Sequence, residues 1–296
     1  MTYFVELLIN GVSIGLIYAL IAIGFTVIFK ATQVLNFAQG STLLLGAYVV
    51  VQLQERLGFY GAVLAGVAVA AAVAGAIEVF LVRRASTHEH ISLAILTLGI
   101  DIALATELSR RIGSEVLSFA DPWGNRTTAI GPFVVPQARL AAMVVCAVIA
   151  VAFFALLKYT SWGIAVRATA EDPEAAALMG INRHRVAATS WALAGGLAAV
   201  AGVFMGTAPS PGLTSTANVT ALNAFPAAVI GGLDSPGGAV VGGLIVGVVQ
   251  SLSGGYNDQV SFLGSPLSEV SGYVVMIMIL LWRPSGLYGT REMTRV

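Results

Sequence analysis

A long run of residues without a charge is the feature that most constrains how this chain can fold. Residues 186–233 contain no Asp, Glu, Lys or Arg. One helix over that run would be about 72 Å long, more than twice the hydrocarbon thickness of a bilayer. Pro209, Pro211 and Gly212 interrupt the run near its middle, and proline there removes a helical hydrogen bond. The run therefore predicts two membrane-spanning segments separated by a break.

The rest of the chain is also poor in charge. Only 10% of its residues are charged, 57% are hydrophobic and the net charge is zero, whereas about 25% of a soluble domain is charged. Composition therefore excludes a soluble globular protein, a disordered chain and an unusually basic nucleic-acid-binding protein. The single cysteine, Cys146, excludes an intrachain disulfide framework and a cysteine-rich metal site.

Apolar stretches long enough to cross a bilayer recur along the whole sequence. We expect an all-α, polytopic transmembrane helical bundle, with residues 1–296 forming a single transmembrane domain. About nine hydrophobic segments are expected, and one or two of them can be broken helices. They are residues 7–29, 31–54, 57–77, 91–108, 140–157, two segments within 186–233, 235–257, and 270–282, the last beginning nearer 263 if Glu269 lies at the interface.

Basic residues in the loops predict the orientation of the bundle, because Lys and Arg accumulate on the cytoplasmic side. With an odd number of crossings, the external side holds Arg56, Arg110, Arg111, Arg126 and Arg139. The other ten of the fifteen basic residues lie opposite, namely Lys30, Arg83, Arg84, Lys158, Arg167, Arg183, Arg185, Arg283, Arg291 and Arg295. We therefore expect the N-terminus outside and the C-terminus in the cytoplasm. Residues 110–139 then form an external loop, and residues 158–186 form a cytoplasmic loop.

The cytoplasmic loop contains the end signals of one short helix. Asp172 suits its N-cap, Pro173 its first position and Gly180 its C-terminal stop. Glu174 suits the positive end of the helix dipole. A helix of about two turns cannot stand alone in water. It must lie on the membrane surface, which the spacing alone favours, or fit a groove on a cytoplasmic partner.

The same loop resembles part of a known motif. Glu174–Ala176, followed after three residues by Gly180, matches the first half of the EAA…G loop of ABC importer permeases. The second half of that motif, an Ile and a Leu-Pro, is absent, and Ser190 and Trp191 stand near its place. In that family the helix inserts into the nucleotide-binding subunit. The residues that the resemblance implies for ATPase coupling are Glu174, Ala175, Ala176, Leu178, Met179 and Gly180.

Similar segments are distributed in order along nearly the whole chain. They are Leu35–Gly40, Arg167–Asn182, Ala194–Val203, Ala228–Gln250 and Leu281–Gly289. With these segments, the chain is similar to branched-chain amino-acid ABC transporter permeases of the LivH type. The resemblance implies a multi-pass permease of the bacterial cytoplasmic (inner) membrane that moves a small solute inward. The solute can be Leu, Ile or Val, another amino acid, a short amide or urea.

The resemblance also implies which proteins accompany the chain in the membrane. They are a periplasmic or extracellular substrate-binding protein, a second related permease subunit and two cytoplasmic ATPase subunits. The chain itself has no Gly-x-x-x-x-Gly-Lys-Ser/Thr loop for ATP. Energy from ATP would therefore come from another polypeptide.

Two polar, glycine-rich interruptions are candidate points on a translocation pathway. They are Asn36–Thr42 and Gly231–Gly238. Irregular backbone at membrane depth is tolerated only where protein or a water-filled cavity covers it, and broken segments point to a transport pathway. Each can instead be an ordinary cytoplasmic turn, the interpretation that we favour for the second. The candidate pathway or gate residues are Asn36, Phe37, Gln39, Gly40, Ser41, Asp234, Ser235 and Pro236.

Acidic residues within apolar segments are further functional candidates. Glu78 suits the interface, five residues before Arg83, and Glu107 suits the outer interface beside two arginines. Asp101 is the deepest of the three. It can face the pathway or pair with a polar group on a neighbouring helix.

Several pairs of glycines are spaced four residues apart. Gly11 with Gly15, and Gly243 with Gly247, are examples. Such spacing favours close helix packing, either within the chain or against a second permease subunit.

No group of residues suggests catalysis. His88-Glu89-His90 lacks the spacing of a zinc protease helix, and neither a metal nor a cofactor is expected. We therefore expect a transport subunit and not an enzyme. Two alternatives remain, an ion-gradient-driven secondary transporter and an intramembrane enzyme. The EAA-like loop favours the ABC permease over the first, because a secondary transporter needs no helix that docks on an ATPase.

Overall fold

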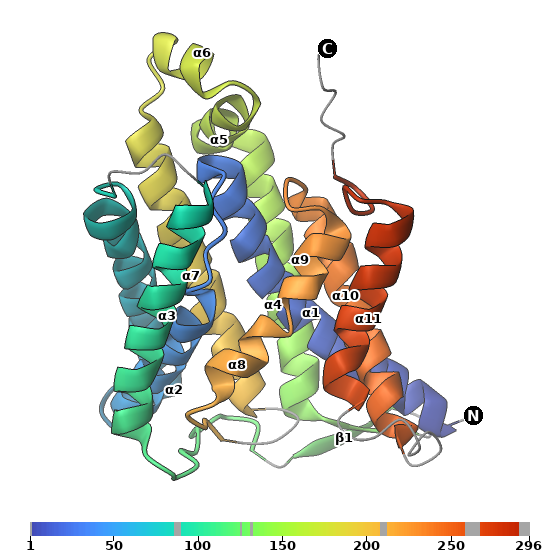
Figure 1. Ribbon diagram of the computed structural model, residues 1–296. Coiled ribbons are helices and arrows are strands. Elements are labelled where there is room, and N and C mark those ends of the chain that lie inside the picture. Colours follow the sequence, from blue (N-terminus) through green and yellow to red (C-terminus); the bar gives the residue numbers. More distant parts are fainter. Residues whose placement is uncertain are drawn as a thin grey trace.

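The computed structural model describes residues 2–85, 90–124, 126–130, 133–207, 212–257 and 267–289, and they form a helical bundle (Figure 1). Its helices are α1 (Thr2–Thr32), α2 (Gln39–Ile77), the π-helix η1 (Glu78–Val82), α3 (His90–Ile112), α4 (Gln137–Tyr159), α5 (Ser161–Glu171), α6 (Pro173–Leu178), α7 (Arg183–Thr207), α8 (Ala217–Leu222), α9 (Phe225–Gly231), α10 (Pro236–Gly255) and α11 (Leu267–Trp282). Two short strands, β1 (Thr127–Ile130) and β2 (Phe133–Pro136), pair antiparallel.

Within the described ranges, six helices are long and apolar enough to cross a membrane. They are α1, α2 with η1, α3, α4, α7 and α10. Two apolar helical stretches are shorter, Ala217–Gly231 and Leu267–Trp282. These helices confirm a multi-pass, all-α membrane protein. Fewer helices reach spanning length than the nine segments we expected.

The length of α2 conceals a reversal of the chain. Gly58 has a φ of +69°, which interrupts the helix. The two halves pack against each other, because a Cβ on Gly66 would lie 2.7 Å from the carbonyl oxygen of Gly46. The halves match the expected segments 31–54 and 57–77, although the first begins only at Gln39. The expected helix start was too early because Gln33 adopts a φ of +56° and residues 34–36 have no regular secondary structure.

Two helices, α1 and α7, form the centre of the bundle. Residues 17–23 of α1 are buried throughout, and Trp191 of α7 is fully buried. Glycines let these helices approach their neighbours closely: a Cβ on Gly15 would lie 2.9 Å from the Cα of Leu244 in α10. The expected close packing of the glycine pairs therefore occurs within the chain.

The two ends of the bundle differ (Figure 1). One, called here the α6 end, carries the end of α1, η1, α5, α6, the start of α7 and the end of α11. The other, the hairpin end, carries β1, β2, the start of α4 and the start of α11. The expected loops 158–186 and 110–139 lie at these opposite ends. Neither α5 nor the β1–β2 hairpin was expected, since α5 lies in a loop that was expected to hold only one short helix and each strand has only four residues.

Candidate functional site

The short helix α6 protrudes at one end of the bundle, and its first turn is capped as the sequence predicts. The side chain of Asp172 accepts hydrogen bonds from the backbone N–H groups of Glu174 and Ala175, both at 2.9 Å. Pro173 occupies the first helical position. The cap satisfies two of the backbone donors that a helix start leaves unpaired.

The other end of α6 closes in a Schellman motif. Gly180 has a φ of +85°, and its N–H donates to the carbonyl of Ala177 at 3.0 Å. The N–H of Ile181 donates to the carbonyl of Ala176, also at 3.0 Å. Because a glycine adopts this left-handed conformation without a Cβ clash, Gly180 ends the helix sharply.

Only one side of α6 is covered by the rest of the chain. Ala176 is buried, whereas the side chains of Leu178 and Met179 are 90% and 84% exposed. Glu174 and Ala175 are exposed as well. A protruding helix tip with two fully exposed apolar side chains is a surface suited to another protein.

The helices on either side fix the position of α6. On α5, the indole Nε1 of Trp162 donates to Thr189 Oγ1 of α7 at 2.8 Å. The guanidinium of Arg167 donates to the carbonyl of Leu157 on α4. These bonds hold α5 against α4 and α7. Because α6 lies between α5 and α7 in the chain, they also fix both of its ends.

The first polar interruption, Asn36–Thr42, lies inside the bundle. Asn36 and Gln39 are only 2% and 1% exposed, and Ser41 is fully buried. The amide of Gln39 donates to the carbonyl of Ala194 in α7 at 3.1 Å. Ala194 lies about 17 Å along α7 from its start, so this segment reaches well into the bundle.

Helix α3 supplies the partners of this buried segment. Thr97 Oγ1 accepts the N–H of Phe37 at 3.1 Å and donates to the carbonyl of Leu35 at 3.0 Å. Asp101 Oδ1 accepts the N–H of Ser41 at 2.9 Å. The carboxylate thereby caps α2 from a neighbouring helix, where the N-cap residue has no side-chain bond of its own.

A second break lies beside the first. Helices α8 and α9 are separated at Asn223 and Ala224. The ring of Phe225, at the start of α9, lies 5.9 Å from the ring of Phe37. At Gly40 an added Cβ would lie 2.6 Å from the carbonyl oxygen of Asn218 in α8. Two irregular backbone segments, distant in sequence, therefore meet within the bundle.

The second polar interruption, Gly231–Gly238, is a tight turn at the α6 end. Ser235 Oγ accepts the N–H of Gly238 at 3.1 Å, and Pro236 begins α10. The Nζ of Lys30 donates to the carbonyl of Asp234 at 3.2 Å. The N–H of Leu287 donates to the carbonyl of Ile230 at 2.8 Å, which ties the turn to the segment after α11.

A cavity of about 670 Å³ lies between this turn and the base of α6. Among its lining residues are Lys30, Gln33, Glu171, Pro173, Asp234 and Ser285. The cavity thus adjoins both the candidate gate and the loop that carries α6. Asn36 and Gln39 are not among its lining residues.

The three acidic candidates have different partners. Glu78 is buried and pairs with Arg83, with 2.6 Å between Oε2 and Nη2. Glu107 is partly exposed and pairs with Arg110 and Arg111 at 2.9 and 2.7 Å. Asp101 binds a backbone N–H on α2. Within the described ranges, no group of three or more His, Cys, Asp or Glu is placed to hold a metal ion; residues 88 and 89 lie outside these ranges.

Three further residues belong to this site and were not predicted from the sequence, namely Thr97, Asn218 and Phe225. One signal was present for Thr97, because it precedes Asp101 by four residues in an apolar helix. Positions i and i+4 lie on the same helix face, so both polar groups face the Asn36–Thr42 segment. Asn218 and Phe225 carry no such local signal.

The chain is similar to known proteins that all belong to one family. Residues 7–282 match the family described as branched-chain amino acid transport system / permease component. The chain is 31% identical to the high-affinity branched-chain amino acid transport system permease protein LivH of Salmonella typhimurium and of Escherichia coli K12, over 99% of this chain and 98% of each relative. It is 28% identical to the permease protein BraD of Pseudomonas aeruginosa, with the same coverage.

A solved structure shares the fold. PsaBC from Streptococcus pneumoniae in complex with Fab aligns with a TM-score of 0.50 at 16% identity, over 94% of this chain and 91% of that chain. At this identity the likeness concerns the fold alone. The match over residues 7–282 and the full-length identity to the LivH relatives show that this chain belongs to the permease-component family of branched-chain amino acid transport systems.

Proposed function

We propose that this chain is the membrane-spanning permease subunit of an ABC importer that moves branched-chain amino acids, or similar small polar solutes, inward. The observation that carries the proposal is α6, a capped helix that presents the almost fully exposed side chains of Leu178 and Met179. Family membership supports it. A secondary transporter would have no use for such a docking helix.

The assembly in this proposal has four kinds of component. Two cytoplasmic ATPase subunits receive α6 of this chain and the matching helix of a second, related permease subunit. A periplasmic or extracellular binding protein delivers the solute at the hairpin end. The names of the LivH and BraD relatives support the choice of branched-chain amino acids.

The proposed topology has nine membrane segments. To the six long helices it adds a second crossing, because α2 folds back at Gly58, and the two shorter stretches α8–α9 and α11. An odd number of crossings suits the start of α1 and the end of α11, which lie at opposite ends of the bundle (Figure 1). We place the α6 end in the cytoplasm, since Lys30, Arg83, Lys158 and most other basic residues belong to segments there.

The proposed pathway runs past the Asn36–Thr42 segment and the break between α8 and α9. Irregular backbone at this depth must be covered by protein or line a water-filled cavity. Thr220 of α8 is exposed beside it, and such a polar group suits a solute pathway or a second permease subunit better than lipid. Gln39 and Asn36 are the side chains whose amides would bind a polar solute once the bundle opens.

For Asp234, Ser235 and Pro236 we propose a role in the cytoplasmic gate. The turn adjoins the cavity that also reaches the base of α6 at Pro173. Movement of α6 would therefore change the cavity wall and, with it, the contact between Lys30 and Asp234. In this role the turn moves without contacting the solute.

The test of the coupling surface is the double substitution Leu178→Asp and Met179→Asp. Both side chains are exposed, so the chain should fold and insert normally, while the ATPase subunits should no longer copurify. Solute uptake should fall at least about tenfold, the effect of losing roughly 1.4 kcal/mol or more of docking energy. Val134→Asp, at an exposed position of the hairpin end, is the matched control and should retain the ATPase subunits.

Two outcomes would reject the proposal. One is an unchanged yield of ATPase subunits and unchanged ATP-driven uptake in the Leu178→Asp, Met179→Asp variant. The other is uptake by this chain alone that depends on an ion gradient and resists vanadate, which would instead support a secondary transporter.

A further inference from the structure

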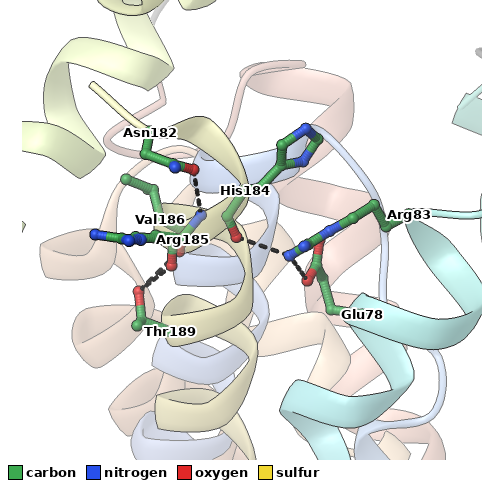
Figure 2. A network of polar contacts seen from close by, with 7 residues as sticks. All are labelled: Glu78, Arg83, Asn182, His184, Arg185, Val186 and Thr189. Atoms are coloured by element: carbon green, nitrogen blue, oxygen red, sulfur yellow. Dashed lines mark hydrogen bonds and ion pairs between the residues drawn. The ribbon is translucent and has the colours of Figure 1, made fainter. Parts of the chain in front are cut away.

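A π-helical turn ends the second half of α2. In η1 the N–H of Arg83 donates to the carbonyl of Glu78, five residues earlier, at 2.8 Å. This wider turn brings the guanidinium back over the carboxylate, with Nε 3.2 Å from Oε1 and Nη2 2.6 Å from Oε2 (Figure 2). π-Helical turns are rare and often occur at functional sites. The ion pair is two-bonded and therefore fixed in orientation.

The same guanidinium also contacts the helix that leaves the α6 loop. Arg83 Nη2 donates to the carbonyl of His184, in the first turn of α7, at 2.9 Å (Figure 2). That turn is rigidly capped, since Asn182 Oδ1 accepts the N–H of Arg185 at 3.1 Å. Arg83 thus ties the exit of the α6 loop to the end of α2.

Helix α7 leads from this tie to the buried pathway segment. Its Ala194 carbonyl accepts the Gln39 amide. It packs closely along α2: an added Cβ on Gly195 would lie 2.6 Å from the carbonyl oxygen of Ala70, and one on Gly202 would lie 2.9 Å from that of Leu43. Interfaces this tight do not deform continuously, so α2 and α7 can move together as one body.

We propose that Glu78 and Arg83 form a strut that transmits movement of α6 to the α2–α7 unit. When an ATPase displaces α6, the Arg83–His184 bond makes the start of α7 carry α2 with it, so that the displacement reaches Gln39. Without the bond, the first turn of α7 would tilt or unwind alone. The proposal rests on the proposed function. Glu78 and Arg83 are positioning residues, and neither contacts the solute.

Stability and coupling can be separated at this pair. Glu78 is 3% exposed, so removing Arg83 alone leaves a buried carboxylate without its partner and destabilises the fold. Removing both charges restores much of that stability. If the pair serves folding alone, the double variant should show normal uptake per ATP. If the pair transmits movement, the double variant should fold but hydrolyse ATP without normal uptake.

The experiment uses the complete complex, with its ATPase subunits and binding protein, in vesicles. Uptake of labelled leucine, isoleucine and valine is measured together with ATP hydrolysis, and melting temperatures are recorded. The variants are Arg83→Gln, Arg83→Lys and the double variant Glu78→Gln/Arg83→Gln. Arg84→Gln, at the exposed neighbouring arginine whose guanidinium lies over the ring of Phe80, is the matched control.

Arg83→Gln and the double variant should hydrolyse ATP while their uptake per ATP falls about five- to twentyfold, the size of a typical coupling term. Arg83→Lys keeps a charge beside Glu78, but an ammonium cannot hold the carboxylate and the His184 carbonyl in the same fork geometry. Uptake per ATP in Arg83→Lys should therefore fall by about threefold. The melting temperature of the double variant should exceed that of Arg83→Gln, and Arg84→Gln should match wild type in both uptake per ATP and melting temperature.

Wild-type uptake per ATP in the double variant would overturn the proposal that Glu78 and Arg83 transmit movement of α6. If that variant does not fold, an unchanged ratio in Arg83→Lys would overturn it equally. A wild-type complex that accumulates none of the three amino acids, no other amino acid, no short amide and no urea on addition of ATP would instead reject the proposed function, and the strut with it.

Discussion

The two polar, glycine-rich interruptions look alike in sequence and differ in structure. Asn36–Thr42 is buried within the bundle, and its side chains and backbone bind α3 and α7. Gly231–Gly238 is a turn at the α6 end, where glycines let backbone meet backbone. The first uses its polar side chains for long-range contacts, and the second uses its glycines for close approach. Composition alone did not separate these two uses.

This difference indicates which positions in each segment should be sensitive to substitution. In the turn, the sensitive positions are those with no space for a side chain. In the buried segment, they are those whose polar atoms have partners. Substitutions in and around the two segments test this contrast, and the largest effect is expected in the turn.

Gly231→Val should abolish accumulation of the folded chain. An added Cβ at Gly231 would meet the backbone of Gly238, and backbone cannot move aside cheaply. The expected loss of stability is more than about 4 kcal/mol. Gly237→Ala is the matched control, since nothing lies within 4 Å of a Cβ there. Size-exclusion chromatography of the detergent-solubilised proteins measures both, and a folded Gly231→Val variant would contradict the tight turn.

Asp101→Leu should lower the free energy of unfolding by about 1–3 kcal/mol, because the buried N–H of Ser41 loses its acceptor. Asp101→Asn retains an oxygen that can accept this bond and should cost less. Glu107→Gln breaks exposed ion pairs and should change stability by under about 1 kcal/mol. Thermal unfolding in one detergent ranks the three. Equal melting temperatures for Asp101→Leu and Glu107→Gln would contradict the expectation that buried Asp101 contributes more to stability than Glu107.

Gln39→Leu should raise the KM for uptake about tenfold if the amide binds the solute, which corresponds to roughly 1.4 kcal/mol. Gln39→Asn, which keeps an amide on a shorter stem, should lie between this variant and wild type. Uptake at several solute concentrations, at matched amounts of assembled complex, gives KM directly. An unchanged KM in Gln39→Leu would show that the Gln39 amide does not bind the solute and serves only the contact between α2 and α7.

Ser235→Ala should produce the smallest effect. It removes the cap of α10 and should cost about 1 kcal/mol of stability. In the proposed gate the turn does not contact the solute, so KM should stay at the wild-type value, in contrast to Gln39→Leu. A changed KM in Ser235→Ala would show that the two interruptions bind the solute together.

Local signals in the sequence predicted much of the architecture. The scarcity of charge predicted a helical membrane protein, and Asp172, Pro173 and Gly180 predicted α6 correctly. Their effects act within one turn of helix, so no knowledge of distant contacts is required. The role of α6 remains a prediction until the ATPase docking test.

The polar contacts of the buried segment could not be predicted in the same way. The bond between Asp101 and Ser41 joins residues sixty positions apart, and that between Gln39 and Ala194 spans α2 and α7. Such pairs depend on how helices pack, which hydrophobic periodicity does not specify when helices are apolar all round. The same limit explains why Phe225 was missed. The early helix start at residue 31 had another cause, because a segment without charge need not be helical along its whole length.

The exposed tip of α6 has a consequence for the life of the protein in the cell. In the proposed orientation, the exposed side chains of Leu178 and Met179 face the cytoplasm on any copy that has not yet bound an ATPase subunit. Chaperones and proteases act on such exposed apolar groups. The supply of ATPase would then set how long a newly made permease survives, and the stoichiometry of the complex would be maintained by degradation of unpartnered copies.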